Sequence, residues 1–193
     1  MEAKTSRFSD WCKKYFTVSS IAFNAIIAAL YAVVTLLSAP LSYNFMQFRI
    51  SELLNLLVFF NPTYTIGLTL GCLIANLAST AGIFDIVFGT LATLISCVIV
   101  SVLCRWVKCL FLSGLIPCLV NAIIVPFVIY LASLNTPDAF ALGTMYWTMF
   151  FWVFLGEFAV ICVAGYPIFF ALTKKVPKIN ELLVLTIHLD FKW

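Results

Sequence analysis

Hydrophobic residues dominate this chain in long runs that short polar segments separate. Six such runs have the length of a membrane-crossing helix or somewhat less. We expect helices at residues 18–39, 50–60, 63–78, 85–103, 110–134 and 144–172. The second is short and Asn61-Pro62 follows it, so a tight turn should join it to the third. The pattern predicts an all-α integral membrane protein, a bundle of six transmembrane helices.

Composition supports the membrane assignment. Hydrophobic residues make up 64% of the 193 residues, charged residues 10%, and the mean hydropathy is +1.11, whereas ordinary globular domains contain about 25% charged residues. Residues 8–14 are mixed and no signal-peptide cleavage site follows, so we expect the first helix to be retained. We divide the chain into a cytoplasmic lead-in (1–17), a transmembrane domain (18–173) and a cytoplasmic tail (174–193).

The basic residues predict the orientation, because Lys and Arg are retained on the cytoplasmic side. With both termini in the cytoplasm, ten of the eleven basic residues fall on that side. Arg49 is the exception. It either anchors in lipid headgroups, closes as a loop residue over a site, or pairs with Glu52.

Cysteine and histidine give little sign of metal chemistry. The seven cysteines form no CxxC pair, and we interpret them as structural. The single histidine, His188, lies in the tail and receives no role. We expect no metal and no cofactor.

Polar residues within the apolar runs are the candidate binding residues, since charged groups are costly in a bilayer. Glu52, Asn76 and Asp85 should all lie toward the outer side. Asp85 could instead cap the start of its helix. Asn121 precedes Ala122, whose carbonyl loses its helical donor at Pro126, so it is either part of a ligand site or an interhelical hydrogen-bonding residue.

Glu157 lies deep in the last run with no nearby cation in sequence. It could be a proton relay, a ligand-binding carboxylate or an inert buried residue. Helical spacing puts aromatic residues on its face, and such a column would stack on a flat ring, although it could equally face lipid or core. These residues are Trp147, Phe150 or Phe151, and Phe154.

Two helices contain small residues at a spacing of four, which keeps them on one face. The first helix has Ala25, Ala28, Ala29 and Ala32, and the third has Gly67, Gly71 and Ala75. Small residues let another backbone approach closely. Each face therefore serves either packing within the bundle or contact with a separate membrane subunit.

The chain resembles the QueT family in five runs that occur in the same order. They are QFRISE (47–52), GCLIAN (71–76), DIVFGTLATL (85–94), NA (121–122) and GE (156–157). The family comprises substrate-binding S components of energy-coupling factor (ECF) vitamin transporters, associated with uptake of queuosine precursors. The resemblance implies a six-helix bundle with cytoplasmic termini and a ligand held in the outer half under external loops.

The resemblance also implies partners and a ligand. The transmembrane T component would contact Ala25, Ala28, Ala29 and Ala32, and two ATPase subunits would drive toppling of the bundle. Because this chain has no GxxxxGK[ST] loop, ATP hydrolysis would belong to those partners.

The expected ligand is a 7-deazaguanine base, such as the aminomethyl form. Glu157 would read its guanine-like edge, Asn121 or Asn76 its carbonyl and ring nitrogens, and Glu52 or Asp85 a cationic arm. Trp147 would stack on it, and Gln47 and Arg49 would belong to the lid.

Functions of other classes are the alternatives. A stand-alone proton-coupled carrier would use Glu157 and Asp85 as its proton path. An intramembrane enzyme is disfavoured, because the sequence shows no paired catalytic aspartates, no HExxH and no Ser with a His partner in the membrane. A purely structural subunit would not explain so many polar groups at one end.

Overall fold

The computed structural model describes residues 17–38, 49–79, 82–103, 106, 109–133 and 145–175. All the elements in these ranges are helical, and their bounds follow the predicted runs within a few residues. They are α2 (Val18–Leu37), η1 (Ile50–Leu56), α4 (Leu57–Phe60), η2 (Pro62–Tyr64), α5 (Thr65–Asn76), η3 (Asp85–Gly89), α6 (Thr90–Leu103), α7 (Leu110–Ser133), α9 (Tyr146–Phe158), η4 (Ala159–Gly165) and α10 (Tyr166–Lys175). The elements η1 and η2 are 3₁₀-helical, whereas η3 and η4 have wider, π-helical turns.

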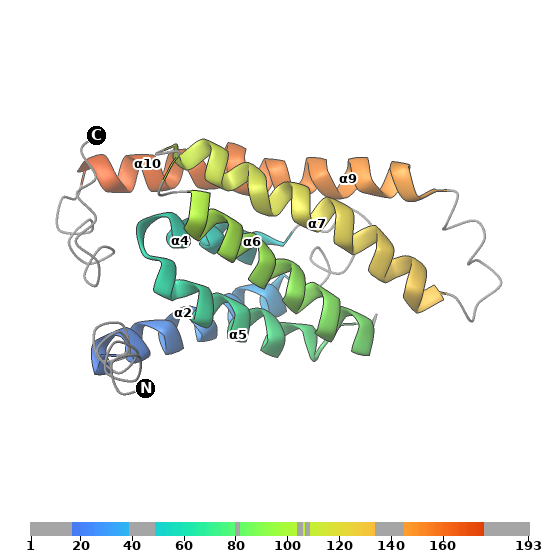
Figure 1. Ribbon diagram of the computed structural model, residues 1–193, viewed down its shortest axis with the longest axis horizontal. Helices are drawn as coiled ribbons and strands as arrows, with labels where there is room; N and C mark the ends of the chain where they lie inside the picture. Colours follow the sequence, from blue (N-terminus) through green and yellow to red (C-terminus); the bar gives the residue numbers. More distant parts are fainter. Residues whose placement is uncertain are drawn as a thin grey trace, which may run out of the picture.

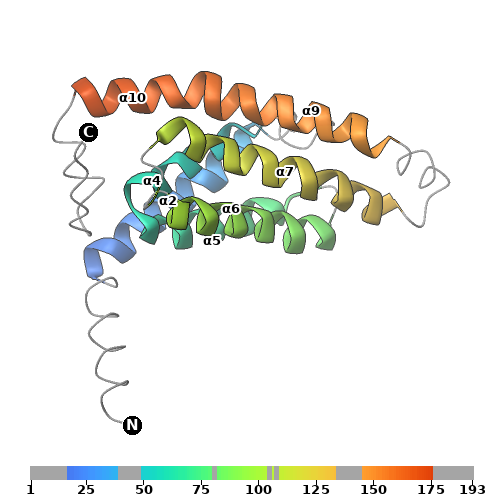
Figure 2. The ribbon, with the colours of Figure 1, turned by 45° about the horizontal axis from the view of Figure 1, so that its top comes forward.

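The helices form an elongated bundle (Figure 1). α2 packs on α5, α5 on α6, α6 on α7 and α7 on α9, so neighbours in the chain are mostly neighbours in space. The continuous rod of α9, η4 and α10 runs along one edge, opposite α2 and α5 (Figure 2). The beginning of α2 and the end of α10 lie toward the same end of the bundle.

Within the described residues, four helical stretches are long and apolar enough to cross a membrane. They are Val18–Leu37, Asp85–Leu103, Leu110–Leu131 and Tyr146–Lys174. α5 has 12 residues, so its length is about 18 Å at the α-helical rise, short of the roughly 30 Å of a hydrocarbon core. The stretch Ile50–Phe60 is also short. The all-α, multi-pass prediction is therefore confirmed, and four of the six predicted crossings have the necessary length.

The turn between α4 and α5 forms as the sequence predicts. The side chain of Asn61 accepts hydrogen bonds from the Thr63 amide at 3.0 Å and the Thr63 hydroxyl at 2.8 Å. Pro62 occupies the first position of η2, where no backbone donor is needed. The chain reverses here while all four residues of α4 remain buried.

α2 and α5 approach closely because α5 has glycines where they meet. A Cβ atom built on Gly71 would lie 2.7 Å from the carbonyl oxygen of Ala28 and 2.8 Å from the Cβ of Tyr31. Nearby, the side chain of Asn24 accepts a hydrogen bond from the Gly67 amide at 2.8 Å. That amide lies in the first turn of α5, which has no carbonyl partner of its own helix. The glycine face of the third predicted helix thus serves packing within the bundle.

The alanines of α2 divide between two faces. Ala28 and Ala32 are buried, whereas Ala25 and Ala29, at the edge of the buried face, are exposed. Only the exposed pair is therefore accessible to another membrane protein.

We expect Gly71→Ala to destabilise the bundle by about 1–3 kcal/mol, the usual cost of overpacking a close contact. The physical reason is that the added methyl group would meet backbone, which cannot move aside as a flexible side chain can. Chemical denaturation in detergent would measure the loss. Ala22→Val, on the exposed face of α2, is the matched control and should change little; equal effects of the two substitutions would contradict this account of the helix pair.

Candidate functional site

A buried ion pair joins η1 to η3. The guanidinium Nη2 of Arg49 lies 3.2 Å from Oδ2 and 3.3 Å from Oδ1 of Asp85, and both side chains are almost completely buried. Arg49 is 3% exposed, so the headgroup-anchor interpretation is wrong. The predicted pairing with Glu52 is also wrong, because the ion pair seen is with Asp85.

Asp85 begins the π-helical segment η3 and does not cap a helix. The N-cap position of η3 is Phe84, and the Asp85 carboxylate pairs with Arg49, so the N-cap interpretation is wrong. Its backbone carbonyl accepts a hydrogen bond from Nδ2 of Asn76 at 3.0 Å, which ties the end of α5 to the start of η3. With Nδ2 used in this way, the buried Oδ1 of Asn76 has no hydrogen-bond partner among the described residues.

Gly89 makes this arrangement possible, and the sequence analysis gave it no role. A Cβ atom at Gly89 would lie 2.7 Å from Oδ1 of Asp85 and 2.8 Å from Nδ2 of Asn76. Both side chains therefore occupy the space that a larger residue would take. The available signal was the position of Gly89 four residues after Asp85 in a helix, on the same face.

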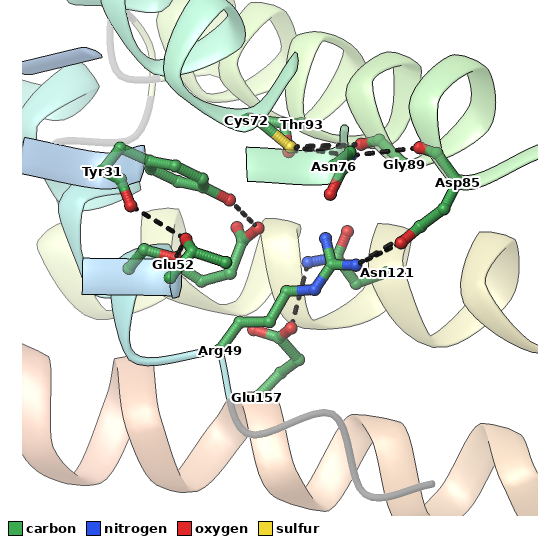
Figure 3. A network of polar contacts seen from close by, with 12 residues as sticks. Tyr31, Arg49, Glu52, Cys72, Asn76, Asp85, Gly89, Thr93, Asn121 and Glu157 are labelled. Atoms are coloured by element: carbon green, nitrogen blue, oxygen red, sulfur yellow. Dashed lines mark hydrogen bonds and ion pairs between the residues drawn. The ribbon is translucent and has the colours of Figure 1, made fainter. Parts of the chain in front are cut away.

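Glu157 and Asn121 lie on facing helices, α9 and α7. Nδ2 of Asn121 donates a hydrogen bond to Oε1 of Glu157 at 3.2 Å. Glu157 is 0% exposed, and its second oxygen, Oε2, has no partner among the described residues. Figure 3 shows the Arg49 guanidinium pointing toward Asp85, with Asn121 and Glu157 drawn close by.

Glu52 is buried a short distance away, with a donor on each oxygen. The hydroxyl of Tyr31 donates to Oε1 at 2.5 Å, and Nδ2 of Asn55 donates to Oε2. All three side chains are at most 2% exposed. Tyr31 and Asn55 were missed by the sequence analysis, because a phenol and an amide within apolar runs resemble ordinary interior residues until their contacts are known.

The aromatic column of α9 forms, but Trp147 is not gathered with the buried residues. Phe150 stacks on Phe154 with centroids 6.5 Å apart and an interplanar angle of 4°, and Phe154 stacks on Phe158. Trp147 contacts the edge of Phe150 and is 74% exposed. Phe151 is also exposed, so Phe150 is the member that shares the face of Phe154. Gln47 lies outside the described residues.

The cluster is rich in acceptors and short of positive charge. Three carboxylates, those of Glu52, Asp85 and Glu157, are buried with one guanidinium, that of Arg49. Two buried oxygens, Oε2 of Glu157 and Oδ1 of Asn76, have no hydrogen-bond donor within the described ranges. Because a buried polar atom without a partner is costly, this cluster suits a compound that supplies N–H donors and positive charge. In the same part of the chain no group of three His, Cys, Asp or Glu side chains could hold a metal ion.

Comparison with known proteins identifies relatives of this chain. The sequence profile described as QueT transporter matches residues 21–174. A curated relative, the queuosine precursor transporter QueT of Lactococcus lactis subsp. cremoris (strain MG1363), is 47% identical over 74 residues. That alignment spans 37% of this chain and 43% of the relative, less than half of each. No solved structure matches the chain.

Breaking the ion pair from one side should cost more than removing it entirely. We expect Arg49→Gln and Asp85→Asn each to lower the free energy of unfolding by about 3–5 kcal/mol, because each leaves a buried charge without its partner. The double variant should lose less than either single variant. Denaturation of all four proteins in detergent measures this coupling, with Val98→Ala on the exposed face of α6 as control. Additive losses would show that the two residues act independently.

Proposed function

This chain belongs to the QueT transporter family, and from that premise we propose that it is the substrate-binding S component of an ECF-type importer. It is a multi-pass membrane protein with several apolar helices. In this proposal the chain sits in the cell membrane with both termini in the cytoplasm, captures a queuosine precursor at the outer face and topples to release it inside. A T component and two ATPase subunits drive the cycle.

The observation that supports the substrate most directly is the unpartnered oxygen of Glu157. A 7-deazaguanine presents two adjacent donors on its guanine-like edge, and these match a carboxylate in paired, charge-assisted hydrogen bonds. Asn121 orients Glu157 through one acceptor site of Oε1, which leaves the second site of Oε1 and the unpartnered Oε2 for the two donors of the base. Glu157 therefore reads the base edge, with Asn121 beside it.

Charge balance favours a base with a cationic arm. Three buried carboxylates accompany one arginine, and an aminomethyl group adds the positive charge that this cluster lacks. Of the two carboxylates that the sequence suggested for the arm, Glu52 accepts from Tyr31 and Asn55, and Asp85 accepts from Arg49. Asp85 is favoured because Asn76, which bonds to its backbone carbonyl, offers a buried Oδ1 without a donor among the described residues.

We place the stacking surface on Phe150 and Phe154, on the face of Glu157, in place of the exposed Trp147.

The exposed alanines of α2 are the proposed contact with the T component. Ala25 and Ala29 face outward, whereas Ala28 and Ala32 are buried in the bundle. Small exposed residues permit close helix–helix approach in a membrane, where dispersion and not hydrophobicity drives association. The partner surface that the sequence suggested is thus narrowed to two of its four residues.

Equilibrium binding to the purified protein in detergent tests the substrate assignment. We expect saturable binding of aminomethyl-7-deazaguanine, weaker binding of 7-deazaguanine and none of thiamine or riboflavin. Glu157→Gln should weaken binding by about 10- to 100-fold, since charge-assisted hydrogen bonds contribute about 1.5–3 kcal/mol. Trp152→Phe on an exposed side of α9 is the control. If Glu157→Gln bound the base as tightly as wild type, the edge-reading role would be wrong.

A transport assay separates the S-component proposal from a stand-alone proton-coupled carrier, which the buried carboxylates Asp85 and Glu157 would also suit. In proteoliposomes that contain this chain alone, we expect no uptake of labelled aminomethyl-7-deazaguanine under an imposed pH gradient. Uptake should require a T component and ATPases with ATP on their side. Gradient-driven uptake by the chain alone would favour the carrier instead.

A further inference from the structure

Glu52 and its donors fasten the first turn of η1 to α2. Tyr31 belongs to α2 and donates to Glu52 across the helix interface, and Asn55 donates from the next turn of η1 itself. A second tie lies beside the first, where the hydroxyl of Thr35 on α2 donates to the hydroxyl of Ser51 at 2.6 Å. All of these side chains are buried. Two hydrogen-bonded links therefore join α2 to the same short turn.

Arg49 directly precedes that turn, at the N-cap position of η1. The Glu52 amide donates to the Arg49 carbonyl at 3.0 Å, which closes the first turn of η1 directly behind Arg49. A 3₁₀ helix has poorer hydrogen-bond geometry than an α-helix and rarely persists without external support. The backbone position of Arg49 thus depends on how firmly Glu52 is held.

We propose that Tyr31, Glu52 and Asn55 are positioning residues, whose hydrogen bonds hold η1 against α2 so that the Arg49 guanidinium reaches Asp85. None of the three contacts the ligand in this assignment. Glu52 therefore has a different task from the cationic-arm contact that its charge and place in the sequence suggested. The consequence for ligand binding rests on the proposed function, whereas the consequence for Arg49 does not.

Chemical modification of Arg49 in the ligand-free protein tests the positioning directly. The chain has three arginines, Arg7, Arg49 and Arg105, and peptide mass spectrometry distinguishes their reaction with phenylglyoxal. Arg49 is buried in the wild type and should react slowly. We expect Tyr31→Phe and Glu52→Gln to raise its rate by about tenfold, the factor for one lost hydrogen bond to a charged group. Tyr166→Phe, which removes a phenol hydroxyl from α10, should leave the rate unchanged.

A donor–acceptor exchange distinguishes positioning from a general loss of packing. Glu52→Gln sets an amide donor against the Asn55 amide, whereas Glu52→Gln combined with Asn55→Asp restores a donor and a carboxylate acceptor in the same place. We expect the double variant to return the Arg49 rate to within about threefold of wild type. Binding of aminomethyl-7-deazaguanine should weaken and recover in the same order.

The outcomes separate this inference from the proposed function. Unchanged modification of Arg49 in folded Tyr31→Phe, or equal rates in Glu52→Gln and the double variant, overturns the positioning role. If the modification rates follow the expected order while the wild type binds no 7-deazaguanine, the positioning role stands and the substrate assignment fails. Folding of each variant is checked by its denaturation profile in the same detergent.

Discussion

The cost of placing charge in an apolar interior governs the arrangement of this protein. A buried charge is tolerated only when an opposite charge or several hydrogen-bond donors accompany it. The pair of Arg49 with Asp85 meets this condition across two segments that are distant in the sequence. Tyr31 and Asn55 meet it for Glu52, and Asn121 meets it in part for Glu157. Each contact in the cluster therefore supplies a partner to a buried charge, and Oε2 of Glu157 is an acceptor that remains without one among the described residues.

Most of the helices could be predicted from the sequence, because apolar runs and turn residues are local signals. The stretch Leu110–Ser133 lies within one residue of its predicted bounds, and the turn at Asn61-Pro62 forms as expected. The buried polar residues of the cluster could also be found from the sequence, since polar residues are rare in such a chain, and their role in binding stays a prediction. Neither the apolar runs nor the rarity of polar residues predicted the contact between Asn121 and Glu157, because that contact depends on how α7 packs against α9.

The sequence could not show which side chains of the cluster pair with each other, and the reason is physical. Arg49 has Glu52 three residues away in the chain, yet the ion pair forms with Asp85, 36 residues distant. Which carboxylate an arginine meets depends on the relative rotation of η1 and η3, and no local pattern records it. The same limit applies to α2, where spacing placed four alanines near one face but could not tell that Ala28 is buried and Ala29 is exposed.

The π-helical turns of η4 have a consequence for how α9 and α10 relate to each other. A π-turn accommodates one more residue than an α-turn, and one residue of an α-helix corresponds to about 100° of rotation. Residues on α10 are therefore out of phase with those on α9, so a single helical wheel drawn through both assigns wrong faces to one of them. Deleting one residue between Ala159 and Gly165 would rotate α10 against α9, which is held by its packing on α7, without altering any residue of the cluster. The length of this segment, and not only its composition, therefore determines which face α10 turns to the bundle.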